Sequence, residues 1–335
     1  MRKTTFRACM RLPIACLMTA ALVAAASLSA LSALAQTYPT KPVRVIVPSQ
    51  AGGGSDTTMR LVAPKLGEYL SQQIVVDDRP GASGNLGAEL VARAAPDGYT
   101  LVSLFASHTS NMAVMKTVPF DVARDFAPIT LMVKLPNVIV SHPSLPVKTV
   151  KELIALGKAR PGQLQCATAG IGSNAHLTMA LFLSMTGVNM LHVPYKASPQ
   201  GVMDVLAGHV PLMVANLLVA LPHIKSQRMR AYGVTSAKRS SAAPEIPTII
   251  ESGVPDYEAV QWYGLFAPAA TPREIISKLH AGTVLALQDA TIKKRFVDDG
   301  ADPAPSASPE EYGAFVRAEV AKWGKVVKAA GIQPE

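Results

Sequence analysis

The chain has 335 residues, a formal net charge of +9 and three cysteines. The charge is modest and no Lys/Arg-rich run carries interleaved aromatic residues, so we do not expect nucleic-acid binding. The length is ample for a hydrophobic core and favours two lobes over one.

The first 35 residues have the features of a secretory signal peptide. A basic start leads into a short apolar run rich in Ala and Leu, and residues 33–35 form an Ala-x-Ala cleavage signal. We predict cleavage after Ala35, so that the mature protein begins at Gln36 and is periplasmic. An uncleaved membrane anchor is the alternative, which the short run with its Pro13 disfavours.

Cysteine usage predicts a mature protein without an internal disulfide. Cys9 and Cys16 lie in the leader, which leaves Cys166 alone. Within "LQCATAG" this residue has the surroundings of a small buried strand residue, and a reactive thiol is the alternative.

Short apolar segments then alternate with helical segments, the pattern of strands and helices in α/β proteins. The C-terminal part is mainly helical. The expected strands are 43–47, 73–78, 99–105, 137–143, 164–169, 191–195, 210–216 and 229–236. The expected helices lie near 56–70, 86–94, 174–185 and 199–207, with a further helix that opens at Thr149.

This alternation predicts an α/β fold with mainly parallel sheets that are flanked by helices. The number of strands is large for one sheet, so we divide the mature chain into two lobes. Lobe 1 comprises 36–136 with 260–335, and lobe 2 comprises 137–259. The chain crosses between the lobes near 136 and near 259, and the final helices return to pack on lobe 1.

Four expected strands run into loops of Gly, Ser, Ala or Thr that precede helices. Ser, Thr, Asp and Asn at helix starts accept hydrogen bonds from free backbone N–H groups, and glycine lets the backbone approach a ligand. A helix N-terminus also carries a partial positive charge of about half an electron. Two such termini that face each other across a cleft would hold a carboxylate without an arginine. One loop alone is more often a turn, whereas several at the same sheet edge indicate a site. The loops are "VPSQAGGGSD", "SLFASHTSN", "CATAGIGSNAH" and "HVPYKASPQ".

Nucleotide, metal and catalytic motifs fail on spacing. Thr57 occupies the position where G-x-G-x-x-G needs its last glycine, and both Gly-Lys pairs lack the upstream glycine of a P-loop. The nucleophile motif G-x-S-x-G is absent, and the seven histidines show no metal-ligand spacing. We therefore expect no cofactor, no metal site and no catalytic residue, and a protein that is not an enzyme.

Three side chains near these loops each have two interpretations. His176 follows a Gly/Ser loop, where it either contacts a ligand or hydrogen-bonds the loop. Lys196 follows an apolar strand and either pairs with an acidic ligand or is solvated. Trp262, in "QWYGLFAP", either walls the cleft or belongs to the core at the second crossing.

The order of several motifs resembles the substrate-binding proteins of tripartite tricarboxylate transporters, the Bug or TctC-like receptors. The matching stretches include "YPTKPVRVIVPSQAGGGSD", "VVDDRPGASGNLGAELVARAAPDGYTL", "HVPYKASPQGVMDVLAGHV" and "IPTIIESGVPDYEAVQWYGLFAPAATP". With three further stretches they cover essentially the whole mature chain.

The resemblance implies a monomeric periplasmic binding protein of the two-lobed, type II-like Venus flytrap kind, which delivers its ligand to membrane permease subunits. It also implies that loops 51–56 and 168–174 oppose each other and hold one carboxylate through backbone and hydroxyl groups, with bridging waters. Together with the loop argument, it defines the expected ligand-binding set. This set comprises Ala51, Gly52, Gly53, Gly54, Ser55, Asp56, Ser107, Thr168, Ala169, Gly170, Gly172, Ser173, Asn174, His176, Tyr195, Lys196 and Asn216.

Departures from the family pattern bear on ligand preference. Ser49 and Gln50 replace Phe and Pro at the mouth of the expected pocket. Ala215 stands where many members have Asp, and Ala180 stands where the family has Glu. Both losses make that side of the expected pocket less acidic, which favours an organic mono- or dicarboxylate over a cationic ligand.

The favoured function is therefore binding of a small organic carboxylate for transport. Two alternatives stand beside it: an exported receptor that serves a signalling partner, and an exported hydrolase or isomerase on a similar scaffold. The enzyme has less support, because it would need a nucleophile–base pair or a metal and the sequence shows neither.

Overall fold

The computed structural model describes residues 38–195 and 198–332. It separates a short N-terminal unit from a compact unit that begins at Lys41 and contains the described helices and strands. The predicted leader at 1–35, with its cleavage position after Ala35, lies outside the described residues.

The first part of the compact unit alternates strands and helices, because its apolar residues follow the two corresponding periods. β1 (Val43–Val47) is almost wholly buried, as expected for a strand that is covered on both faces. The next helix begins at Gly54, slightly before the predicted start, because Gly53 takes the extended conformation of an N-cap residue. The elements after β1 are α2 (Gly54–Leu70), β2 (Ile74–Asp78), a 3₁₀ turn (Ala82–Gly84), α3 (Asn85–Ala92), β3 (Thr100–Phe105) and α4 (Ala106–Val114).

The middle of the chain continues this alternation after one long strand, β4 (Phe126–Ser141). The side chain of Thr149 accepts a hydrogen bond from the Glu152 N–H, so α5 begins where the sequence predicts it. Gly187 ends α6 in the left-handed conformation, at φ 67°. The elements after β4 are α5 (Val150–Ala159), β5 (Gln165–Thr168), α6 (Asn174–Thr186), β6 (Leu191–Pro194), α7 (Ser198–Leu206), β7 (Leu212–Asn216), α8 (Leu217–Lys225) and β8 (Arg230–Val234).

The last part of the chain returns through one more long strand and is then mainly helical, as predicted. β9 (Val260–Pro268) is not among the expected strands; it forms because its buried residues pair along the full first part of β4. The elements after β9 are α9 (Arg273–Gln288), α10 (Ala290–Asp298), β10 (Asp302–Pro303) and α11 (Pro309–Ala329).

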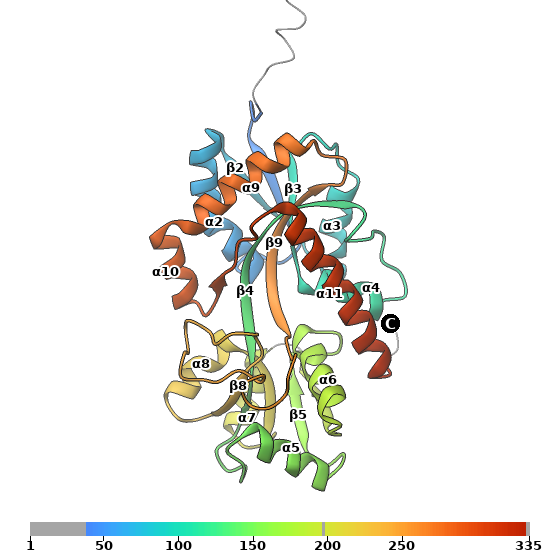
Figure 1. Ribbon diagram of the computed structural model, residues 1–335, viewed down its shortest axis with the longest axis vertical. Coiled ribbons are helices and arrows are strands. Elements are labelled where there is room, and N and C mark those ends of the chain that lie inside the picture. The colour runs from blue at the N-terminus through green and yellow to red at the C-terminus, as the bar shows by residue number, and fades with distance from the viewer. Residues whose placement is uncertain (1–37, 196–197, 333–335) are drawn as a thin grey trace, which may run out of the picture. The chain divides into compact units, whose positions relative to one another are not determined.

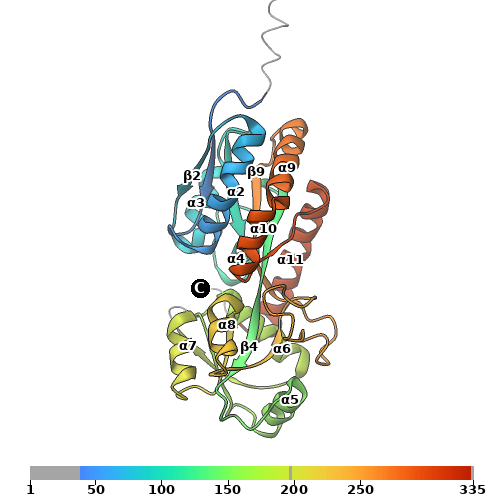
Figure 2. The same ribbon diagram turned by 90° about the vertical axis from the view of Figure 1, so that its left-hand side faces the viewer.

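The described strands join in the order β2-β1-β3-β9-β4-β7-β5-β6, with β8 and β10 also paired to β4. β1 is parallel to β2 and β3, and β5 is parallel to β6 and β7. β4 and β9 are antiparallel to each other and to their other neighbours. Helices lie on both sides of these central strands (Figure 2). The α/β class is confirmed, and the sheet is mixed because the two central strands carry the chain across it in opposite directions.

β4 joins the two parts of the sheet (Figure 1). From Phe126 to Pro136 it pairs with β9, and from Asn137 to Ser141 it pairs with β7 and β8. The structure thus extends the expected strand, 137–143, back through Pro136, whose missing N–H is tolerated where the strand changes partners. The change of partners lies at the predicted first crossing, while the lobe boundaries themselves stay a prediction.

The C-terminal helix α11 packs against elements of both parts of the sheet. It contacts α4 and β4, as a return to lobe 1 requires, but it also contacts α6. Trp323, Val326 and Val327 belong to one buried apolar cluster with residues of α6 and β5. The contacts of the last helix therefore reach beyond the predicted lobe 1, because its apolar face continues to its C-terminal turns.

Tyr312 of α11 lies against the backbone of β9 at Gly264, where an added Cβ would overlap the tyrosine hydroxyl and ring. We predict that Gly264→Ala lowers the free energy of unfolding by about 1–3 kcal/mol, because it overpacks this contact. The loss should be smaller when Tyr312→Ala is also present, since the overlap needs both groups. Urea unfolding followed by circular dichroism measures these differences.

Gly324→Ala, on the same helix, is the control for this substitution. Apart from its chain neighbours and the nearby backbone of its own helix, no atom lies within 4 Å of a Cβ added at Gly324. Its stability should stay unchanged or rise by about 0.5–1 kcal/mol, because Gly in a helix interior is unfavourable. Equal losses for Gly264→Ala with and without the Tyr312 substitution would contradict the packing explanation.

Candidate functional site

Two sets of loops follow the carboxyl ends of the strands, where α/β sheets bind ligands. The first set contains 48–56 after β1, 79–85 after β2 and the start of α4 after β3. The second set contains 169–173 after β5, Tyr195 after β6 and the start of α8 after β7.

Polar side chains in the loop after β1 form hydrogen bonds within the protein. The Gly52 N–H donates to Asp56 Oδ2 at 2.8 Å, and Ser55 Oγ lies 2.9 Å from Ser103 Oγ. Ser55 and Asp56 are both buried. These two predicted ligand residues therefore hold the shape of the loop.

The start of α2 presents backbone groups instead. Gly53 occupies the N-cap position without a side-chain cap, so the first N–H groups of α2 lack the usual side-chain acceptor. Gly53 is half-buried, and Ala51, Gly52 and Gly54 are exposed. This predicted part of the site is thus accessible and made of backbone donors.

Arg60 neutralises the acidic residues beside this loop. Its guanidinium lies 2.5 Å from Asp56 Oδ1 and 2.8 Å from Asp78 Oδ2. Burial raises the pKa of Asp78, and the hydrogen bond from Arg60 opposes that rise. Two carboxyl groups share this one cation, so the attraction for an anion here comes from backbone dipoles.

The turn at 81–84 belongs to the first set of loops, and none of its residues is in the predicted ligand-binding set. Gly81, Ala82, Ser83 and Gly84 have φ values of 132°, 46°, 57° and 92°. For Ala and Ser the left-handed region costs about 1–2 kcal/mol each, so surrounding contacts must hold the turn. Asn111 of α4 supplies one, because its Nδ2 donates to the Ser83 carbonyl at 3.4 Å. The available signal is "PGASGN", which by itself indicates only a turn.

Aromatic rings pack against the first set of loops. A Cβ added at Gly54 would overlap the Tyr263 hydroxyl, so this hydroxyl lies against the start of α2. The Phe105 ring packs edge-on against Tyr263, with 6.4 Å between centroids, and against His108, with 4.2 Å. His108 accepts the Phe105 N–H at Nδ1, and burial lowers its pKa to about 4. Ser107, a predicted ligand residue, is half-buried beside it.

The loop after β5 is a tight turn that ends in a capped helix. Gly170 and Gly172 have φ values of 114° and 71°, which favour glycine. Ser173 Oγ donates to the Gly170 carbonyl at 2.7 Å and accepts the His176 N–H at 3.2 Å. Thr168 is buried below the turn. The half-buried members of the predicted set in this loop are Ala169, Gly170, Gly172, Ser173 and Asn174.

His176 hydrogen-bonds the loop, which is one of its two sequence interpretations. Its Nδ1 accepts the Gly172 N–H at 3.1 Å, and its ring stacks on that of His192. His192 is absent from the predicted set, because nothing in the local sequence shows that the two rings meet.

Asn174 ties the start of α6 to both central strands. Its Oδ1 accepts from Asn137 Nδ2 of β4 at 2.6 Å, and its Nδ2 donates to the Val260 carbonyl of β9 at 3.3 Å. Asn137 Nδ2 also donates to Thr178 Oγ1 at 3.0 Å. Hydrogen bonds through Asn137 therefore anchor the loop after β5 near the position where β4 changes its partner strands. Asn137 is not in the predicted ligand-binding set.

The remaining predicted residues have structural partners or lie outside the described chain. The Tyr195 hydroxyl donates to Asp204 Oδ2 at 2.6 Å, and burial followed by this carboxylate raises the pKa of Tyr195 to about 12. Asn216 caps α8 by accepting the Leu218 N–H at 3.0 Å. Lys196 lies outside the described residues.

A hollow of about 290 Å³ lies where the two sets of loops meet. Ser83 borders it from the first set, Asn111 borders it from the second half of α4, and Gly172 borders it from the second set. The structure therefore brings the predicted loop after β5 next to the unpredicted turn at 81–84. The lining residues are Ser83, Asn111, Val114, Met115, Ile171, Gly172 and Ile332.

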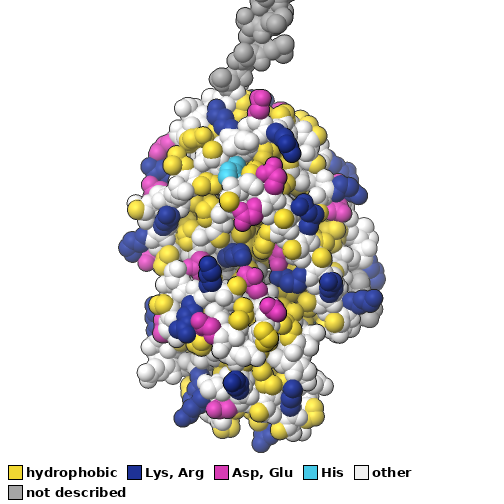
Figure 3. Space-filling model, viewed as in Figure 1, with side chains coloured by type: hydrophobic (Ala, Val, Ile, Leu, Met, Phe, Trp, Pro, Cys, Tyr) yellow, Lys and Arg dark blue, Asp and Glu magenta, His cyan; other side chains and the backbone are white. Residues whose placement is uncertain are grey.

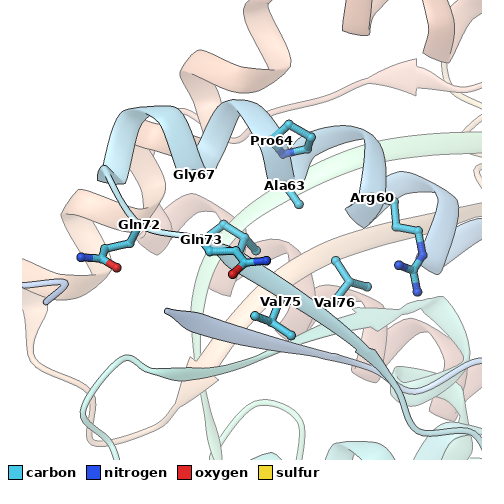
Figure 4. Close-up of a pocket in the computed structure, with 9 residues that line it drawn as sticks. Arg60, Ala63, Pro64, Gly67, Gln72, Gln73, Val75 and Val76 are labelled. Atoms are coloured by element: carbon cyan, nitrogen blue, oxygen red, sulfur yellow. The ribbon is translucent and has the colours of Figure 1, made fainter. Parts of the chain in front are cut away.

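A larger groove runs between α2 and β2 (Figure 4). Arg60 and Pro64 of α2 line one wall, and residues 72–76 line the other. The groove is a surface feature beside an edge strand, and it contains none of the predicted ligand residues. Its size alone does not make it the binding site.

The described residues contain no arrangement for catalysis by a metal or by the Ser173–His176 pair. No group of His, Cys, Asp and Glu in that part of the chain is placed to hold a metal ion. The His176 imidazole accepts the Gly172 N–H, while Ser173 Oγ bonds backbone groups, so the two side chains do not form a nucleophile–base pair.

Two surface properties bear on the class of partner. Within residues 38–195 and 198–332, every helix is too short or too polar to cross a membrane. The face in Figure 3 intersperses Lys and Arg with Asp and Glu and gathers no continuous basic surface.

Burial decides the interpretation of three other residues. Trp262 is fully buried and donates from Nε1 to Glu319 Oε2 at 3.3 Å, so it belongs to the core at the crossing and does not wall a cleft. Ala215 and Ala180 are buried in apolar clusters and do not border the hollow. Their positions therefore do not support the expectation that they set the acidity of the pocket.

Comparison with known proteins finds matches over most of the chain. The family model "Tripartite tricarboxylate transporter family receptor" matches residues 58–332. Protein BugT of Bordetella pertussis is 36% identical over 301 residues, which cover 89% of this chain and 91% of that protein.

Two solved structures are similar over their whole length. The structure "R. palustris Rpa4515 with adipate" has 37% identity and a TM-score of 0.74, and the match covers 89% of this chain and 100% of that one. MatC (Rpa3494) from Rhodopseudomonas palustris with bound malate has 29% identity and a TM-score of 0.70, covering 87% and 100%.

Burial of His108 and His176 makes stability depend on pH. Burial lowers the pKa of each to about 4, from about 6.5 in the unfolded chain. The unfolded state then binds more protons, so stability is full above pH 6.5 and is lost as the pH falls towards 4. For the fully buried His108 we predict a loss of about 3 kcal/mol across this window, measured by urea unfolding.

His108→Asn is the matched variant, because its Oδ1 can accept the Phe105 N–H but does not titrate. Its unfolding free energy should fall less steeply between pH 6.5 and 4 than that of the wild type. Parallel pH profiles for the two proteins would show that His108 does not contribute.

Proposed function

Because the chain belongs to the tripartite tricarboxylate transporter receptor family, we propose that it binds a small organic mono- or dicarboxylate and delivers it to a tripartite membrane permease. Its similarity to structures that hold adipate and malate supports a carboxylate ligand.

The observation that carries the proposal is the start of α2. Its first N–H groups lack a side-chain cap, and the nearby Arg60 is already engaged by Asp56 and Asp78. A ligand carboxylate would supply the missing acceptor and would benefit from the helix dipole. The loop after β5 would contribute the second set of contacts, and the hydrogen bonds of Gly170, Gly172 and Ser173 within the protein would hold its shape.

We propose further that 36–136 with 260–335 and 137–259 move as two lobes. β4 and β9 would flex where they connect the two parts of the sheet, and ligand bound to both loop sets would favour the closed form. The hollow between the 81–84 turn and Gly172 would then narrow around the body of the ligand.

A thermal-shift series tests the ligand class. Adipate, malate and other linear dicarboxylates of similar length are compared with 1,6-diaminohexane and adipamide, which keep the six-carbon skeleton and change its charge. We predict stabilisation by at least one acid and by neither control. At a hundredfold excess over the dissociation constant, the unfolding free energy rises by about 2.7 kcal/mol.

Small-angle scattering of the protein gives the second readout. Its radius of gyration should be smaller when it is saturated with the acid that binds. Delivery is tested by uptake of the labelled acid into vesicles that carry the permease, which should require added receptor. Stabilisation by the diamine alone would refute the proposed ligand class.

A cap substitution tests the role of the loop after β5. Ser173→Ala removes the cap of α6 and the hydrogen bond to the Gly170 carbonyl. We predict a stability loss of about 1 kcal/mol and about tenfold weaker binding of the acid, measured by calorimetry.

Thr149→Ala is the matched control, because it removes the equivalent cap from α5, away from the hollow. It should cost similar stability and leave affinity unchanged. If both variants weaken binding equally, the effect is one of general stability and the loop has no special role.

A further inference from the structure

The imidazoles of His176 and His192 form a stacked pair beside the loop after β5. Their ring centroids are 4.1 Å apart and their planes differ by 4°. His176 belongs to α6, which follows this loop in the chain, and His192 belongs to β6, which pairs with the preceding strand β5. His176 is only 8% exposed, and His192 is half-buried.

Each ring is connected to one glycine N–H of the loop. The Gly172 N–H donates to His176 Nδ1 at 3.1 Å. His192 Nε2 lies 2.6 Å from Thr168 Oγ1, which also accepts the Gly170 N–H at 3.4 Å. Both glycines have positive φ, so these hydrogen bonds hold a backbone shape that few other residues adopt.

The bond from Gly172 requires a neutral His176. Since Nδ1 is the acceptor, the neutral ring carries its proton on Nε2. A second proton on Nδ1 would turn the acceptor into a donor that faces the Gly172 N–H. Burial, and then the neighbouring His192, lower the pKa of His176 to about 4, and burial lowers the pKa of His192. Both rings are therefore neutral at pH 7.

Titratable groups on the elements packed around the pair are buried or engaged by protein partners. Cys166 is in register with His192, and burial raises the pKa of its thiol to about 12. Burial also raises the pKa of Tyr257, whose hydroxyl bonds the α6 carbonyl of Thr178. On the side of α11, Glu319 accepts hydrogen bonds from two indoles and is paired with Lys322. Beyond β6, Tyr195 is bonded to Asp204.

We propose that His176 and His192 are positioning residues of the carboxylate site. The neutral stacked pair holds Gly170 and Gly172 in the shape that receives the ligand, and protonation of His176 releases the turn. The effect on affinity rests on the proposed function, whereas the effect on the shape of the loop does not.

Nuclear magnetic resonance of the ligand-free protein tests the effect on the loop. Amide signals of ¹⁵N-labelled Gly170 and Gly172 are followed from pH 7.5 to pH 4. In the wild type the Gly172 signal should shift with an apparent pKa well below 6.5. In His176→Asn it should stay nearly constant, because the Asn Oδ1 occupies the position of Nδ1 and does not titrate. The same profile in both proteins would overturn the proposal.

Calorimetric titration with adipate at pH 7.5 tests the effect on binding. His176→Leu removes the acceptor for Gly172, so affinity should fall about tenfold, the effect of one lost hydrogen bond. His176→Asn keeps the acceptor and should stay within about threefold of the wild type. Equal weakening by Leu and Asn would assign the effect to lost ring packing and would overturn the positioning role.

His192→Gln and His192→Leu give an independent pair, in which Gln keeps a polar atom near Thr168 Oγ1. This pair also decides the question if His176→Leu does not fold, as judged by circular dichroism. A wild type that does not bind adipate refutes the proposed function for that acid and leaves the resonance comparison decisive. Normal adipate binding with unshifted glycine signals refutes the positioning role alone.

Discussion

The antiparallel pairing of β4 with β9 is the constraint on which the rest of the structure depends. Both strands are almost wholly buried, and they run through the centre of the sheet in opposite directions. At Pro136 and Asn137, β4 leaves one set of neighbours and joins another. The two sets of loops lie on strands to either side of this pair, so the geometry of the crossing determines how the loops meet.

Buried polar contacts reinforce the crossing. Glu319 accepts hydrogen bonds from the indoles of Trp262 and Trp323, at 3.3 and 2.9 Å, and so links β9 with α11. Asn137 and Asn174 link β4 with the start of α6. Hydrogen-bonded polar groups of this kind tolerate few alternative arrangements, because a displaced group would be left buried and unpaired. The loop that is proposed to hold the ligand is therefore connected to the strands that would bend during closure.

The family assignment and the geometry of the loops both favour ligand binding over catalysis. Membership of a receptor family confirms the prediction that the protein is not an enzyme. Backbone N–H groups at a helix start attract a carboxylate through fixed dipoles and do not titrate near neutral pH. Arg60 has its own acidic partners, so its charge serves the loop and is not offered to a ligand.

The sequence by itself determined the features that depend on neighbouring residues. Periodicity and helix caps predicted the α/β class, the start of α5 at Thr149 and a helix near 174–185 that the structure shows as α6. Tertiary structure alone decided the pairing of β4 with β9 and the stacking of His176 on His192. These contacts join residues that are far apart in the sequence, and the local pattern around each residue does not show which partner it has. A period of apolar residues specifies an element and its buried face, whereas the choice of partner depends on how all the buried faces pack together.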